Sequence, residues 1–164
     1  MSLEKSEIKS LYYIQIIDHV ESIKAQDLSH NIDEILLLKS KNSLGNKCSK
    51  DGFILKDSIR IIDRTIGKIN SSHFTGDVNF KLKLEVKLCN PTEGDIIKCN
   101  VIGRNKMGIL AKVYPLIIAL SQLHHTDLDH FNSIKENDEI MVEVIDSKIT
   151  LNEKDIQIIA KLYN

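Results

Sequence analysis

The sequence predicts an α+β fold that is mainly β. Three observations support this class: one stretch with strict apolar and polar alternation, a series of short apolar segments in the C-terminal half, and one amphipathic helical pattern. A chain of 164 residues can bury one moderate core or two small ones. Charged residues make up 27% of it and the formal net charge is −1, so the composition is that of a globular protein.

The N-terminal half begins with a predicted strand and a predicted helix. Residues 11–20, LYYIQIIDHV, are rich in aromatic and β-branched side chains, which favour a strand. Ser29 and Asn31 are possible N-cap residues, and Glu34 follows Asn31 by three positions. Apolar residues then recur at helical spacing, which predicts an amphipathic helix of about three turns. These residues are Ile32, Ile35, Leu36 and Leu38.

A hairpin and a long strand follow the helix. Asp51-Gly52 predicts a tight turn between KCS and FILKDSIRIID. In residues 80–88, FKLKLEVKL, apolar and mostly basic residues alternate with period two, as in an antiparallel strand with one buried face. The basic face could pair with an acidic partner or simply keep the sheet soluble. Residues 64–76 are rich in turn formers and predict an irregular excursion between strands.

We place a domain boundary at Asn90-Pro91-Thr92-Glu93-Gly94, because proline cannot donate to a strand ladder and glycine favours turns. The predicted domains are residues 1–89 and 90–164. Five short strands are expected in the second domain, with a polar helical insertion, HHTDLDHFNSI, between the third and the fourth. This arrangement is that of an OB-fold barrel. The strands are DIIKCNVIG, GILAKV, LIIALS, EIMVEVID and IQIIAKL.

The segment GDIIKCNVIGRNKMGILAKV resembles the first hairpin of OB-fold RNA-binding domains of the ribosomal-protein type. Gly94 and Gly108 match the glycines that open the first and second strands, whereas Cys99 replaces a glycine usual within the first strand. The order KCSKDGFI, an irregular loop, then GDVNFKLKLEVKLCNPTEGDII resembles the seventh subunit of eukaryotic RNA polymerase II and its archaeal counterpart. The resemblance covers nearly the whole chain. Heavy use of Ile, Lys and Asn is compatible with a viral homologue.

The resemblance implies a non-catalytic subunit of a DNA-directed RNA polymerase. Members of that family have an αβ tip domain, which docks on the polymerase core, and an OB barrel offered to nascent single-stranded RNA. They form a stalk with a smaller fourth-subunit partner. By this resemblance the docking residues lie in the turn-rich excursion, with Ile69 and Phe74 as apolar anchors. The expected docking residues are Gly67, Lys68, Ile69, His73 and Phe74.

The expected RNA-facing edge lies on the first hairpin of the barrel. Alternation places Lys98 and Asn100 on the outward face, and basic residues extend this face into the turn and the second strand. The alternative is a merely solvated hairpin. Residues 91–164 carry 8 Lys/Arg and 11 Asp/Glu, a balance of −3, and Ile109 stands where the family often has a stacking Phe, so we expect weak RNA contact. The candidate residues are Lys98, Asn100, Arg104, Lys106, Lys112, His124 and His125.

Other activities have little support in the sequence. The motif HHTDLDH offers five possible metal ligands but lacks the HExxH spacing of a zinc hydrolase, and no nucleophile elbow, phosphate-binding loop or dinucleotide motif occurs. We therefore expect no enzyme activity, no cofactor and no metal. The alternative function is a free-standing OB-fold RNA-binding or translation-factor-like module.

Cysteine usage and the N-terminus bear on location. Cys48, Cys89 and Cys99 are odd in number and widely spaced, which suits buried, reduced thiols better than disulfides or a zinc site. The first residues lack a signal-peptide pattern, and no apolar run is long enough to cross a membrane. We expect a soluble intracellular protein with no membrane partner, in the nucleus if cellular or in a cytoplasmic viral factory or virion if viral.

Overall fold

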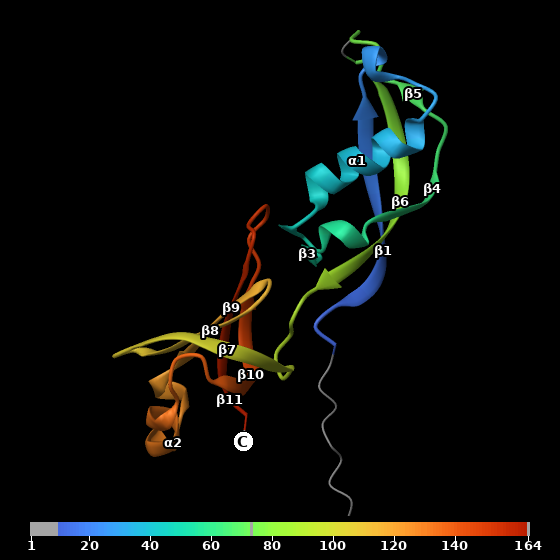
Figure 1. Cartoon of the computed structure of the whole chain (residues 1–164). Coiled ribbons are helices and arrows are strands. Elements are labelled where there is room, and N and C mark those ends of the chain that lie inside the picture. Colours follow the sequence, from blue (N-terminus) through green and yellow to red (C-terminus); the bar gives the residue numbers. More distant parts are fainter. Residues whose placement is uncertain (1–9, 73, 164) are drawn as a thin grey trace, which may run out of the picture. The chain divides into compact units, whose positions relative to one another are not determined.

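The chain is described here by a computed structural model that covers residues 10–72 and 74–163, and it divides into two compact units (Figure 1). The αβ unit comprises Tyr12–Lys47 and Ile54–Leu88. The barrel unit comprises residues 48–53 and 89–163, together with residues 10 and 11. A short segment from the first half of the sequence thus groups with the barrel. The separation into domains 1–89 and 90–164 stays a prediction.

The αβ unit is built on one long strand, β6 (Val78–Cys89). β1 (Tyr13–Ile23) pairs antiparallel with β6 along its full length, without a shift in register. β4 (Arg60–Arg64) and the two-residue β5 (Lys68–Ile69) also pair antiparallel with β6. The strands predicted in residues 11–20 and 80–88 are confirmed. The excursion predicted as irregular contains β5, which is too short to show a period in the sequence.

The predicted helix is confirmed as α1 (Ile32–Leu44), which packs over one face of this sheet. Asn31 occupies the N-cap position, but its side chain makes no capping hydrogen bond. Instead, the Asn31 backbone N–H donates to the Ser29 hydroxyl at 3.3 Å. Asp33 and Glu34 lie in the first turn, where negative charge is favoured by the helix dipole.

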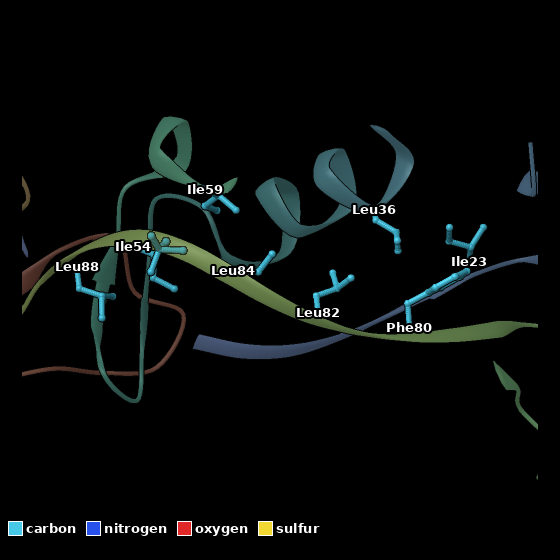
Figure 2. Packing of buried hydrophobic residues seen from close by; sticks show 9 residues of the cluster. Ile23, Leu36, Ile54, Ile59, Phe80, Leu82, Leu84 and Leu88 are labelled. Carbon is cyan, nitrogen blue, oxygen red and sulfur yellow. The ribbon is translucent and has the colours of Figure 1, made fainter. Parts of the chain in front are cut away.

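The hydrophobic core of the αβ unit lies between α1 and the strands, as Figure 2 shows. The apolar face of β6 supplies most of it, and Leu36 of α1 and Ile23 of β1 pack against that face. Burial removes apolar area from water and stabilises the unit. The predicted buried positions of the alternating strand are confirmed: Phe80, Leu82, Leu84, Val86 and Leu88 are all at most 3% exposed.

The barrel unit contains the five predicted strands and the predicted helical insertion. The strands are β7 (Ile96–Asn105), β8 (Gly108–Val113), β9 (Leu116–Ser121), β10 (Glu139–Lys148) and β11 (Ile156–Leu162). The insertion is α2 (Leu128–Ser133). The strands close in the order β10-β11-β9-β8-β7, with β9 and β11 parallel and the other pairs antiparallel. This is the closed five-stranded barrel expected of an OB-fold.

Two of the glycines singled out in the sequence have a geometric reason. Gly94 precedes β7 with a φ of +88°, in the left-handed region that glycine tolerates best. At Gly108 a Cβ atom would lie 2.0 Å from the backbone oxygen of Leu120, so β8 approaches β9 too closely for any side chain. Gly94 lies just before β7 and Gly108 begins β8, in agreement with the positions that the resemblance assigned to them.

A small hairpin from the N-terminal half is bonded within the barrel unit. β2 (Lys47–Ser49) and β3 (Gly52–Ile54) flank the predicted Asp51-Gly52 turn, which is confirmed. The Cys48 N–H donates to the Glu153 oxygen at 2.8 Å, and the Asn152 N–H donates to the Cys48 oxygen at 2.9 Å. Three short 3-10 turns complete the described structure: η1 (Ala25–Asp27), η2 (Lys56–Ser58) and η3 (Gln122–His124). No helix within residues 10–72 and 74–163 has the length and apolarity to span a membrane.

The three cysteines are free and buried, as predicted. Burial raises the pKa of the Cys89 and Cys99 thiols to about 12. The pKa of Cys48 is also raised, first by burial and then by the nearby carboxylates of Asp155 and Glu153.

We expect the free energy of unfolding to fall as the pH rises from about 9 towards about 12. In this window the thiols of the unfolded chain ionise while Cys89 and Cys99 stay protonated in the folded protein. The unfolded state then binds fewer protons, which lowers stability by up to about 1.4 kcal/mol per thiol per pH unit. Urea denaturation of the wild type and Cys99→Ala at about pH 8 and about pH 10.5 measures this. The difference in the free energy of unfolding between the wild type and Cys99→Ala should fall by about 2 kcal/mol from the lower to the higher pH. The same difference at both pH values would contradict the prediction.

Candidate nucleic-acid and docking surfaces

Three of the predicted RNA-facing residues lie together on the outside of the barrel. Lys98 and Asn100 are exposed on β7, and Lys112 is exposed on β8 directly opposite Asn100. The Lys98 ammonium is 2.7 Å from a carboxylate oxygen of Glu139 on β10. Lys98 therefore has a partner within the protein, whereas no hydrogen bond or ion pair engages the side chains of Asn100 and Lys112 in the described part of the chain.

The Arg104 side chain is turned towards α2. Its guanidinium donates to the Asn132 backbone oxygen at 2.7 Å and to the side-chain oxygen of the same residue. It also lies 5.9 Å from the centre of the Phe131 ring, within the range of a cation–π contact. Arg104 thus holds the end of α2 against the first hairpin, and several of its donors are occupied within the protein.

The two adjacent histidines have different surroundings. His125 Nδ1 is 2.8 Å from the Ser121 backbone oxygen, and its Nε2 accepts a hydrogen bond from the Leu162 N–H at 2.9 Å. An N–H group can only donate, so the ring must carry its proton on Nδ1. The ring also packs against Phe131, with centroids 4.5 Å apart. His125 therefore joins η3, α2 and the end of β11, whereas His124 is exposed.

Lys106 lies at the exposed tip of the first hairpin. The Asn105 side-chain oxygen accepts hydrogen bonds from the Met107 and Gly108 N–H groups at 2.9 and 3.0 Å, which fixes the turn. Lys106 itself is exposed, and its ammonium has no ion-pair partner among residues 10–72 and 74–163. The turn therefore presents one lysine on a backbone of defined shape.

A mostly apolar groove runs beside this turn across the outside of the barrel. Leu110 of β8 and Ile159 of β11 both lie next to Ala119 of β9 in the strand register. Together with Met107 and His124 these residues line a hollow of about 470 Å³. Leu110 and Ile159 are 41% and 44% exposed, and Met107 is 81% exposed. The sequence interpretation missed this groove, because its residues come from four strands whose register only the folded barrel fixes.

The interpretation of Ile109 is wrong. The family resemblance placed Ile109 where a stacking aromatic would stand on the binding face, but its side chain is 2% exposed and points into the barrel. β8 begins at Gly108, so that Ile109 and Ala111 face inward while Leu110 and Lys112 face outward. The residues that line the groove include no Phe, Tyr or Trp.

The predicted docking residues lie in the loop that connects β4 with β6. Lys68 and Ile69 form β5 and are exposed, and Phe74 is 98% exposed with a φ of +50°. Gly67 has a packing role, because a Cβ atom there would lie 2.4 Å from Val78 and 2.8 Å from Phe80. His73 lies outside the described residues.

Strand β4 and the loop after it expose apolar residues that the sequence interpretation did not select. Ile66 is 80% exposed and Ile62 is 48% exposed, beside Ile69 at 73%. Ile62 and Ile66 also line a hollow of about 720 Å³ next to the start of α1. Ile61 and Asp63 of β4 pair with consecutive residues of β6, and the register shifts between them. Ile62 is therefore an extra, unpaired residue at a bulge. Strict alternation along FILKDSIRIID could not have predicted this bulge.

The HHTDLDH motif is used for folding. Asp127 is the N-cap of α2, and its carboxylate accepts a hydrogen bond from the His130 N–H at 3.1 Å. His125 is engaged as described above. In the described part of the chain no group of three or more His, Cys, Asp or Glu side chains is placed to hold a metal ion.

Sequence comparison finds relatives of this chain among proteins named as subunits of DNA-directed RNA polymerases. The chain is 30% identical over 167 aligned residues to a protein of Acanthamoeba polyphaga mimivirus named as DNA-directed RNA polymerase subunit L376, covering 94% of this chain and 83% of that one. The chain belongs to the stalk-subunit family of DNA-directed RNA polymerases. Subunit 7 of RNA polymerase II from Arabidopsis thaliana is 28% identical over 113 residues, which cover 68% of this chain and 62% of that subunit. No family model matches the sequence.

Both relatives are named as subunits of DNA-directed RNA polymerases, which places this chain in transcription, and one of them is a viral homologue. The family suspected from the first hairpin, the alternating strand and the boundary proline is confirmed. The alternative of a free-standing translation-factor-like module has no support from either relative.

We expect His125→Ala to lower the free energy of unfolding by about 1–3 kcal/mol, because the Leu162 N–H would lose its acceptor and Phe131 its packing partner. Urea denaturation measures this loss. His124→Ala is the matched control and should stay within about 0.5 kcal/mol of the wild type, since His124 is exposed. Equal effects of the two substitutions would contradict the structural role of His125.

Proposed function

We propose that this chain is a non-catalytic subunit that forms the stalk of a DNA-directed RNA polymerase, docks through the β4–β6 loop and guides nascent RNA along its barrel. The observation that carries the proposal is the similarity to a protein named as a polymerase subunit over 94% of the chain, both units included. Each unit then has its own task, and a fourth-subunit-like chain is the expected stalk partner.

The docking task is supported by the exposed apolar residues of the β4–β6 loop. Ile66, Ile69 and Phe74 are each at least 73% exposed, and burying apolar anchors of this kind supplies most of the energy of an interface. Phe74 also has a left-handed backbone conformation, which is costly for a bulky residue and is found most often where function requires it. An exposed ring held in such a conformation is well suited to enter a pocket of the polymerase core.

The RNA task is supported by the residues of the barrel hairpin whose side chains remain available. Lys106, Lys112, Asn100 and His124 have no partner among residues 10–72 and 74–163, whereas Lys98, Arg104 and His125 are engaged. Two lysines give phosphate contacts without sequence information, and no aromatic ring on the groove supplies stacking. The barrel is therefore suited to weak contact that depends on salt and is indifferent to sequence.

We expect replacing both free lysines, Lys106→Ala with Lys112→Ala, to weaken binding of a short single-stranded RNA and to flatten its salt dependence. Each lost phosphate contact on a single strand lowers the slope of log K against log salt by about 0.7, so the pair should lower it by about 1.4. Fluorescence anisotropy over a range of salt concentrations measures this.

The matched control for the RNA experiment is Lys148→Ala with Lys154→Ala, which removes the same charge from exposed positions away from the hairpin. The control should keep the slope of the wild type. RNA binding in the nanomolar range that does not respond to salt, or an equal change in both double variants, would contradict the guiding role.

We expect Ile69→Ala with Phe74→Ala to reduce co-purification of the chain with the polymerase core at least tenfold, because each buried anchor contributes on the order of 1–2 kcal/mol. Leu28→Ala with Leu38→Ala is the matched control: both residues are exposed and apolar, but lie outside the β4–β6 loop. Quantitative mass spectrometry of the purified polymerase measures occupancy. Undiminished co-purification of the Ile69 and Phe74 variant would show that this loop is not the docking element.

A further inference from the structure

The long strand β1 has a free edge. In the described part of the chain β1 pairs with β6 alone, over eleven positions from Tyr13 opposite Leu88 to Ile23 opposite Val78. In an antiparallel ladder alternate residues direct their N–H and C=O groups away from the paired neighbour. The outer edge of β1 therefore offers a long row of backbone donors and acceptors to a further strand.

This edge lacks several of the features by which proteins usually protect exposed strands, although β1 carries the charged residues Asp18 and Glu21. Short length, proline, lysine and bulges all discourage pairing with another chain. β1, YIQIIDHVESI, has neither Pro nor Lys and keeps an unbroken register. On the other side of β6, by contrast, β5 is two residues long and contains Lys68, and β4 has an irregular register. The sheet is thus open to pairing at β1 and protected at β4 and β5.

Exposed apolar side chains accompany the free edge. Ile14, Ile16 and Val20 share the face of β1 that points away from α1, and they are 64%, 59% and 57% exposed. In Figure 2 the labelled core side chains Ile23 of β1 and Phe80 and Leu82 of β6 lie on the opposite face, towards α1. A strand added to β1 would place a side chain beside each of these residues, where apolar pairs are favourable.

Asp18 determines what kind of strand fits. It lies on the same face between Ile16 and Val20, opposite Lys83 of β6, and no ion pair within residues 10–72 and 74–163 engages its carboxylate. A residue directly opposite Asp18 is favourable if it is Lys or Arg and unfavourable if it is acidic. Two copies of β1 paired antiparallel over their full length would place Asp18 opposite Asp18, and a shift by two residues would place it opposite an apolar side chain. A second copy of this chain is therefore a poor occupant.

We propose that the free edge of β1 receives an extended segment of another chain of the polymerase, which adds an antiparallel strand to the αβ unit. The segment carries apolar residues opposite Ile14, Ile16 and Val20 and a Lys or Arg opposite Asp18. Backbone hydrogen bonds supply the affinity and the alternate side chains supply the specificity, as in other cases of strand addition. The inference rests on the proposed assembly with polymerase, because it is that assembly which brings the second chain.

The first test uses a fluorescein-labelled peptide of β1 length with the full chain. The first peptide is designed to pair antiparallel with β1 and has threonine at every second position. Its other residues are a lysine opposite Asp18 and a valine opposite each of Val20, Ile16 and Ile14. A second peptide has glutamate in place of the lysine. Anisotropy should show about fivefold tighter binding of the lysine peptide, and Asp18→Lys should reverse the preference. The matched control Asp57→Lys makes the same charge change at an exposed residue of η2 and should retain the preference of the wild type.

Ile16→Lys gives a second variant, because it puts a lysine opposite a valine of each peptide and removes that apolar pair, and it should weaken binding of both peptides to a similar degree. Absence of binding by both peptides to the wild type, or a preference that Asp18→Lys does not change, would overturn the inference.

Hydrogen exchange locates the contact in the native assembly. The β1 amides should exchange at least tenfold more slowly in the purified polymerase than in the free chain. If the chain co-purifies with the core while β1 exchanges equally fast in both, the strand-addition inference fails and the docking proposal stands. If the chain does not co-purify at all, the docking proposal fails, and the strand-addition inference is then tested by the peptide titrations alone.

Discussion

The alternating strand β6 is the element on which the αβ unit depends. β1, β4 and β5 all pair with it, and its apolar face supplies five alternate inward residues to the core. Because side chains on a strand alternate with period two, a shift of one residue would turn Phe80, Leu82 and their neighbours towards water and bring lysines inside. Register is therefore strongly specified at β6, and the positions of β1, β4 and the loop between β4 and β6 follow from it.

In the barrel, charge is largely used to hold the fold together. Lys98 pairs with Glu139, Arg104 holds the end of α2, and the ring of His125 is fixed by Ser121 and Leu162. A side chain held in this way must give up its existing contacts before it can bind a ligand. For this physical reason the basic hairpin has few charges available for phosphate, and its affinity for RNA would be low.

Much of the fold was predictable from the sequence because it depends on local periodicity. The strict alternation of FKLKLEVKL, the helical spacing after Asn31 and the glycines at 94 and 108 each have a local physical cause, and each was found where expected. The candidate site was less predictable. Arg104 and His125 have partners 28 and 37 positions away, which no local pattern reveals. Ile109 and Leu110 are both apolar, so only the register of β8 decides which of them faces inward. The bulge that exposes Ile62 and the length of β5 also depend on tertiary pairing.

The hairpin around Cys48 has a consequence for the order of folding. Its sulfur contacts the Asp155 oxygen across 107 positions of sequence, and its backbone bonds to the turn between the last two strands. These contacts form only after residues 152 to 155 have been synthesised, and loop closure over such a separation slows folding. During synthesis the early hairpin must wait for these contacts until the turn before β11 emerges. The barrel unit is therefore completed in a late step that joins this hairpin to the turn between β10 and β11, and a ribosome that stalls before residue 152 would leave it unfinished.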